Sequence, residues 1–132
     1  MLRGRYEEHF PLSKRLKTNS ESRIFIYWNG HGGENFFKIQ DTDIVHSEDL
    51  GKVMDEMHLK GLYMEITFLL DTCEALSLFD KIEAPDIYMI ATSKYDESAV
   101  ASDIDPVINQ YLSDNFSRDF FDFLLSPIGF TQ

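Results

Sequence analysis

Three short runs of continuous apolar residues stand out along the chain, and each ends abruptly at polar or glycine residues. Runs of about five β-branched and aromatic residues are typical of strands buried on both faces. We therefore predict buried strands over residues 24–28, 66–70 and 87–91. The residues that follow them are Asn29-Gly30, Asp71-Thr72 and Thr92-Ser93.

Between the strands the apolar residues recur with helical spacing. The clearest case begins at Ser47, which we predict to be the N-cap, and ends near Gly61. Its apolar positions follow the order i, i+3, i+4 and i+7: Leu50, Val53, Met54 and Met57. Shorter patterns predict a helix over residues 75–82 and a Phe-rich helix over 116–125. Apolar strands that alternate with helices predict an α/β fold, a mostly parallel sheet with helices on both faces.

The length of 132 residues fits one domain. Residues 1–22 are polar and mixed, and we predict that they form an exposed leader. Residues 23–132 then make up the folded domain, which shows no internal repeat. The start of the chain lacks the apolar core of a signal peptide, and no stretch is apolar enough over about 18 to 20 residues to span a bilayer.

Composition and charge exclude several functions. With 43% apolar residues the chain has enough surface to bury and should fold. A net charge of −11, without an extended basic run, makes nucleic acid an unsuitable partner. The single cysteine excludes a disulfide framework and a multi-cysteine metal site, and we predict no metal and no cofactor.

Two residues with reactive side chains follow two different strands. His31 comes just after the strand over residues 24–28, and Cys73 just after the strand over residues 66–70. Reactive groups of open α/β sheets gather beyond the carboxyl ends of the strands, so the two side chains are expected at one rim. A free thiol ionises with a pKa of about 8.5, and a neighbouring imidazole is the usual means of generating the thiolate at neutral pH. This pair predicts nucleophilic catalysis.

Backbone groups beside the pair suggest an oxyanion hole. Gly32 follows His31 directly, and its N–H group, together with the N–H group of Cys73, can face a substrate carbonyl. A structural interpretation fits the same residues, with Cys73 as a small buried apolar residue and His31 as a turn residue. The residues alone leave both interpretations open.

The sequence around both residues resembles a known family. Residues 27–41 (YWNGHGGENFFKIQD) and 68–73 (FLLDTC) are similar to the histidine and cysteine motifs of the legumain-like and caspase-like cysteine peptidases. The likeness continues through nearly all of the chain. Within the family it is greatest to the branch whose members attach glycosylphosphatidylinositol (GPI) lipids to proteins.

The resemblance implies a caspase-like fold with Cys73 as the nucleophile and His31 as the base. It implies that the N–H groups of Gly32 and Cys73 hold the oxyanion. Ser93 and Asp96 are expected to help shape the substrate pocket. In this branch the enzyme cleaves a C-terminal signal from a precursor protein, keeps the acyl group as a thioester and transfers it to the amine of a GPI lipid.

The resemblance also implies partners and a location. The partners are precursor proteins with C-terminal GPI-attachment signals, the GPI lipid and the other transamidase subunits. The location is a membrane complex at the lumenal face of the endoplasmic reticulum. Compared with the family pattern, we expect the fold to be incomplete at the N-terminus, without the leading strands or the asparagine that orients the histidine. The strand over residues 24–28 is then expected to form an exposed edge.

Other functions compete with this one. A legumain-like endopeptidase uses the same pair with water as the acceptor, and an inactive pseudoenzyme keeps the fold as an interaction module. The residues Asp41-Thr42-Asp43 superficially fit the signature of aspartate-nucleophile phosphatases, but Lys38 and Gln40 interrupt the strand that should precede it. The remaining histidines lack the spacing of a helical zinc pair and are predicted to lie at the surface: His9, His46 and His58.

Overall fold

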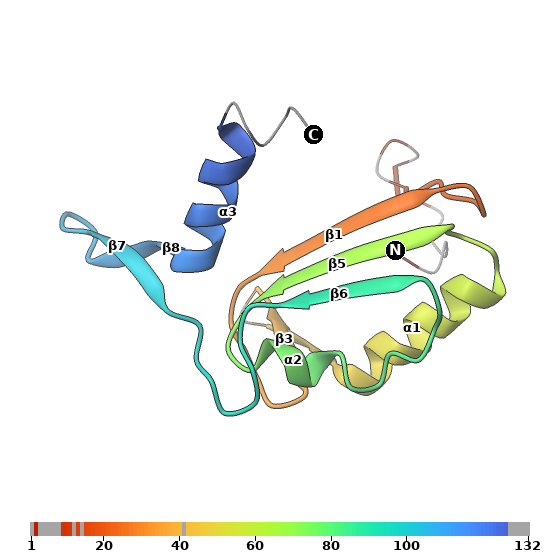
Figure 1. Cartoon of the computed structure of the whole chain (residues 1–132), viewed down its shortest axis with the longest axis horizontal. Coiled ribbons are helices and arrows are strands. Elements are labelled where there is room, and N and C mark those ends of the chain that lie inside the picture. The colour runs from red at the N-terminus through yellow and green to blue at the C-terminus, as the bar shows by residue number, and fades with distance from the viewer. Residues whose placement is uncertain (1, 3–8, 12, 14, 41, 127–132) are drawn as a thin grey trace.

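The three predicted strands form one parallel sheet. The computed structural model describes residues 2, 9–11, 13, 15–40 and 42–126. Strands β1 (Arg23–Asn29), β5 (Glu65–Asp71) and β6 (Ile87–Ala91) pair in the order β1-β5-β6 (Figure 1). Both pairings are parallel, so all three carboxyl ends lie at the same edge. The predicted strands and the α/β class are confirmed.

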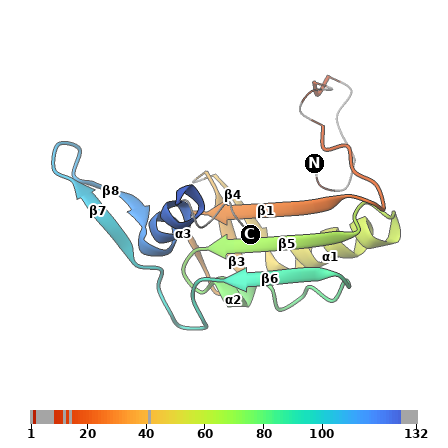
Figure 2. The ribbon, with the colours of Figure 1, turned by 45° about the horizontal axis from the view of Figure 1, so that its top comes forward.

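Two helices lie against one face of this sheet. Helix α1 (Ser47–Leu59) runs along the strands, and the short α2 (Ala75–Leu78) lies near their carboxyl ends (Figures 1 and 2). The apolar positions of α1 meet alternate residues of β5 in one core, because alternate strand residues point to the same face. The fully buried members are Leu50, Met54, Met57, Ile66, Phe68 and Leu70.

The ends of the two helices differ from the predictions. His46, not Ser47, occupies the N-cap of α1, and its side chain makes no capping hydrogen bond. Instead, the N–H of Ser47 donates to the backbone oxygen of Asn35 at 2.9 Å. Helix α2 was predicted to extend to residue 82 but ends at Leu78. The following backbone closes through tighter hydrogen bonds three residues apart, such as Ile82 to Phe79.

Five strands outside the parallel sheet were not predicted. Strands β2 (Gly32–Gly33), β3 (Phe36–Ile39) and β4 (Asp43–His46) form an antiparallel sheet that follows β1. Strands β7 (Ala101–Asp105) and β8 (Gln110–Asp114) form a hairpin that extends beyond the carboxyl ends of the parallel strands (Figure 1). Helix α3 (Asn115–Leu125) follows it, as the Phe-rich pattern predicted.

Burial on both faces was predicted for all three strands, and this is wrong for β1 and β6. Helix α3 covers the second face only near the end of β1, where Tyr27 contacts Phe120 and Phe121. Phe25 and Tyr88 on that face are 58% and 60% exposed. Helices therefore lie on both faces, but the second face is covered only in part. Within the described residues β1 is an edge strand of its sheet, as expected.

Some predictions fall partly outside the described residues. Most of residues 1–14, within the predicted leader, lie outside the described residues. Asp41 of the phosphatase-like motif lies outside them as well. The division of the chain after residue 22 stays a prediction. His9, His46 and His58 are exposed, as predicted. Every helix in the part of the chain that the structure describes is too short or too polar to cross a membrane.

Candidate active site

His31 and Cys73 line the same cavity. This cavity has a volume of about 350 Å³ and lies beyond the carboxyl ends of β1 and β5. His31 is exposed and Cys73 is half-buried, so reagents in solution can reach both. The rest of the wall comes from the end of β1 and from the segment around the β7–β8 hairpin: Asn29, Gly30, Ala99, Ala101, Tyr111, Ser113 and Asp114. The sequence analysis did not foresee the contribution of this hairpin.

The pairing of β1 with β5 brings the two residues together. Asn29 at the end of β1 is the partner of Asp71 at the end of β5. The N–H of Gly30 continues the pairing by donating to the backbone oxygen of Asp71 at 3.2 Å. His31 and Cys73 each stand two residues beyond this last pair. The strand register therefore brings His31 and Cys73 to the same edge of the sheet, as expected.

The backbone around Gly32 leaves its N–H available. The N–H of Lys38 donates to the oxygen of His31 at 2.9 Å, so these two residues form a hydrogen-bonded pair of the β2–β3 hairpin. Such pairs alternate with non-hydrogen-bonded pairs in antiparallel sheets. Gly32 and Phe37 are the next pair, and the N–H of Gly32 consequently points away from β3. Gly32 also lies against Thr72, the residue before Cys73.

The predicted oxyanion role of Gly32 can be tested by substitution. On that prediction we expect Gly32→Ala to slow acyl transfer by about 10²-fold, because a displacement of about 1 Å near the reacting atoms has an effect of that size. A Cβ at Gly32 would lie 2.5 Å from Oγ1 of Thr72 and 2.9 Å from the backbone oxygen of Phe36. The backbone oxygen cannot move without shifting the hairpin. The measurement is the rate of transfer of a peptide acyl group to hydrazine, with circular dichroism to check the fold.

Gly33→Ala is the matched control. Its Cβ would lie 2.8 Å from Cε1 of Phe36, but that ring can rotate away. We expect this variant to keep most of the rate. Equal rates for Gly32→Ala and the unmodified chain would contradict the role of Gly32.

A set of hydrogen bonds holds the loop that carries Cys73. The hydroxyl of Ser93 donates to the backbone oxygen of Thr72 at 2.7 Å and accepts from the N–H of Ala75 at 2.9 Å. On the other side, the hydroxyl of Ser77 accepts from the N–H of Asn35 at 2.8 Å, which ties α2 to the hairpin that follows His31. The N–H of Cys73 itself makes no hydrogen bond within the described residues. It is thus available to a ligand.

The two residues expected to shape the substrate pocket lie elsewhere. Ser93 is 5% exposed and lies beneath the Cys73 loop, where its hydroxyl makes the two hydrogen bonds given above. Asp96 is exposed on the loop after β6. Neither residue lines the cavity of His31 and Cys73. Their contribution to substrate selection stays a prediction.

A buried polar network lies behind the cavity. The carboxylate of Asp71 accepts hydrogen bonds from Asn29, Thr92 and Ser117. Tyr27 joins the network through its hydrogen bond with Ser117. Burial raises the pKa of Tyr27, and the nearby carboxylates of Asp71 and Asp114 oppose its ionisation further, against the lowering effect of the Ser117 hydrogen bond. The only sequence signal for this network was a polar residue at the end of an apolar strand.

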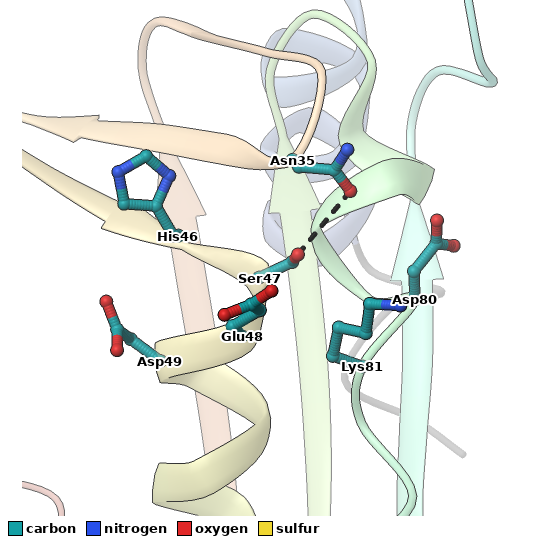
Figure 3. Close-up of a pocket in the computed structure, with 7 residues that line it drawn as sticks. All are labelled: Asn35, His46, Ser47, Glu48, Asp49, Asp80 and Lys81. Carbon is teal, nitrogen blue, oxygen red and sulfur yellow. Dashed lines mark hydrogen bonds between the residues drawn. The ribbon is translucent and has the colours of Figure 1, made fainter.

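A larger cavity lies at the start of α1. Figure 3 shows its side chains, among them the hydrogen bond from Ser47 to Asn35 at 3.4 Å. Its volume is about 470 Å³, and its lining residues are Asn35, His46, Ser47, Glu48, Asp49, Asp80 and Lys81. It shares no lining residue with the cavity of His31 and Cys73. Size alone therefore does not identify the reactive cavity.

A parallel α/β sheet that presents a histidine and a cysteine in one cavity at its carboxyl edge has the arrangement of a caspase-like cysteine peptidase. The sequence pattern of the Peptidase C13 family matches residues 1–124. The chain belongs to this family.

The chain is also similar to proteins that are named GPI-anchor transamidases. It is 40% identical to the protein of Saccharomyces cerevisiae over 124 residues, which are 94% of this chain and 30% of the yeast protein. It is 40% identical to the Schizosaccharomyces pombe protein and 34% identical to the human one, again over 94% of this chain, which is 33% and 31% of those proteins. The chain thus spans about a third of the length of these relatives.

Proposed function

We propose that this chain carries the catalytic pair of a GPI-anchor transamidase. In the proposed reaction, a C-terminal signal is cleaved from a precursor protein and the new carboxyl terminus is joined to the amine of a GPI lipid. The observation that carries the proposal is the shared cavity of His31 and Cys73. The similarity to proteins with that name, at 33–40% identity, supports the choice of substrates.

The proposed mechanism has two acyl transfers. In the first, the thiol of Cys73 loses its proton to His31, and the sulfur attacks the carbonyl carbon at the cleavage site. The oxyanion that forms accepts hydrogen bonds from the N–H groups of Gly32 and Cys73. As the carbon–nitrogen bond breaks, the proton on His31 passes to the departing amine, and a thioester remains on Cys73.

In the second transfer, the amine of the GPI lipid replaces water as the acceptor. Its nitrogen attacks the thioester carbon while His31 takes a proton from it. The bond to sulfur breaks, the proton on His31 returns to the sulfur, the new amide leaves, and both Cys73 and His31 are restored. We further propose that the other transamidase subunits and a membrane of the endoplasmic reticulum surround this site in its working form.

The acceptor distinguishes the candidate functions. A synthetic peptide with a small residue, a polar spacer and an apolar tail imitates a GPI-attachment signal. We expect incubation with the folded chain and hydrazine to give the peptide hydrazide, detected by mass spectrometry, and Cys73→Ala to give none. Release of the free acid alone, even with excess hydrazine, would favour the legumain-like endopeptidase. No cleavage at all would contradict the enzyme and favour the interaction module.

A further inference from the structure

The carboxylate of Asp71 is the buried centre of a hydrogen-bond network, and no basic side chain is among its partners in the part of the chain that the structure describes. Asp71 is 1% exposed. Its Oδ1 accepts from the hydroxyl of Thr92 at 2.7 Å, and its Oδ2 accepts from Nδ2 of Asn29 at 3.1 Å and from the hydroxyl of Ser117. A buried carboxylate is costly unless donors such as these satisfy it. The carboxylate of Asp71 therefore holds its three donors, on Asn29, Thr92 and Ser117, in fixed positions around it.

Each partner belongs to a different segment of the proposed site. Asn29 precedes His31 by two residues, and Asp71 precedes Cys73 by two. Thr92 comes directly before Ser93, whose hydroxyl holds the Cys73 loop. The carboxylate of Asp71 thus joins β5, the strand that leads to Cys73, to three other segments. These are the end of β1, the residue after β6, and α3.

Ser117 extends the network to the wall of the cavity. Its hydroxyl also accepts from Nδ2 of Asn29 at 2.9 Å, and the same amide group donates to Oδ2 of Asp114 at 2.8 Å. Asp114 is the last residue of β8 and lines the cavity, whereas Asp71 does not. Asp71 therefore has no access to a substrate in this cavity and acts through its neighbours.

We propose that Asp71 is a positioning residue that holds His31 in register with Cys73, and that Ser117 of α3 is part of this device. This inference rests on the proposed function, since it assumes that the two side chains react together. The carboxylate takes no part in bond making. Its loss lets the end of β1 shift, which displaces the imidazole of His31 relative to the thiol of Cys73.

The test is the rate at which iodoacetamide alkylates Cys73, the single cysteine of the 132-residue chain. Rates are measured near pH 6 and near pH 9, below and above the ordinary thiol pKa of about 8.5. We expect Asp71→Asn and Ser117→Ala to lower the rate near pH 6 by about tenfold, because a displaced imidazole no longer activates the thiol. Near pH 9 both variants should stay within about twofold of the unmodified chain, because the thiol ionises without help.

Tyr63→Phe is the matched control for the loss of a buried hydrogen bond. The hydroxyl of Tyr63 donates to the backbone oxygen of Pro85 at 2.9 Å, just before β6 and at the opposite end of the sheet from the cavity. We expect this variant to lower the thermal midpoint without changing the ratio of the two rates. A purely structural role of Asp71 would give the same result as this control.

The outcomes separate the two proposals. If the unmodified folded chain reacts near pH 6 no faster than the urea-unfolded chain, the proposed function fails. If the unmodified chain reacts faster and both variants keep its rate ratio, the positioning role of Asp71 is overturned. If Asp71→Asn does not fold, the rate ratio of Ser117→Ala tests the positioning role instead. This variant keeps the carboxylate of Asp71 and removes only one of its donors.

Discussion

On the proposed mechanism, replacing Cys73 with alanine should abolish hydrazide formation, and replacing His31 with alanine should lower its rate by about 10⁴-fold or more, the size of effect seen where catalytic groups act as a unit. Without the sulfur no thioester can form. Without the imidazole, the proposed base that takes the proton of the thiol is gone, and so is the proposed proton donor to the departing amine. The measurement is hydrazide yield over time, followed by mass spectrometry at neutral pH.

His46→Ala is the matched control for the loss of a histidine. His46 is exposed and lines the other cavity, at the start of α1. We expect this variant to retain the full rate. Comparable rates for His31→Ala and His46→Ala would contradict the proposed role of His31 as the base. A full rate with Cys73→Ala would contradict a mechanism that passes through a thioester on Cys73.

A second large effect is expected on stability, from Gly51→Ala in the middle of α1. Alanine is the better helix former by about 1 kcal/mol, so the helix alone predicts stabilisation. In the folded chain, however, a Cβ at Gly51 would lie 2.2 Å from the backbone oxygen of Lys81. Overpacking typically costs about 1–3 kcal/mol, and a clash with rigid backbone belongs at the upper end of that range.

The net expectation for Gly51→Ala is a loss of about 2 kcal/mol of unfolding free energy, or roughly 8 °C in the thermal midpoint. Thermal and urea denaturation followed by circular dichroism measure it. Lys52→Ala is the control on the same helix: Lys52 is exposed, and its ion pair with Asp49 has a nitrogen–oxygen distance of 4.0 Å. We expect it to change stability by less than about 0.5 kcal/mol. A more stable Gly51→Ala chain would contradict the close approach of α1 to Lys81.

The parallel strands were predictable because their apolar runs are continuous and end at polar residues. The strands of the β2-β3-β4 sheet were not, since β2 spans only Gly32–Gly33 and β3 and β4 have four residues each, too few to show alternation. The exposure of Phe25 and Tyr88 could not be read from the sequence either. A local sequence pattern shows which side chains of a strand are apolar, but it does not show which other elements of the fold cover them.

The candidate site divides in the same way. His31 and Cys73 follow predicted strands, and parallel pairing alone places both at one edge. The role of Ser77 and the network of Asp71 depend on contacts between distant segments, such as Ser117 with Asp71. The local sequence of α3 does not indicate Ser117 as a partner of Asp71, because that contact is set by the packing of α3 against Tyr27.

On the proposed mechanism, the register of β1 on β5 also determines when the thiol of Cys73 becomes reactive during folding. Arg23 pairs with Glu65, and these residues are as far apart in sequence as His31 and Cys73. A slip of one residue would turn every side chain of β1 to the opposite face. Parallel pairing between such distant segments closes a long loop and is intrinsically slow. The proposed pairing of His31 with Cys73 therefore predicts that rapid alkylation of Cys73 appears during refolding only once the native register has formed, so that it times the long-range step of refolding.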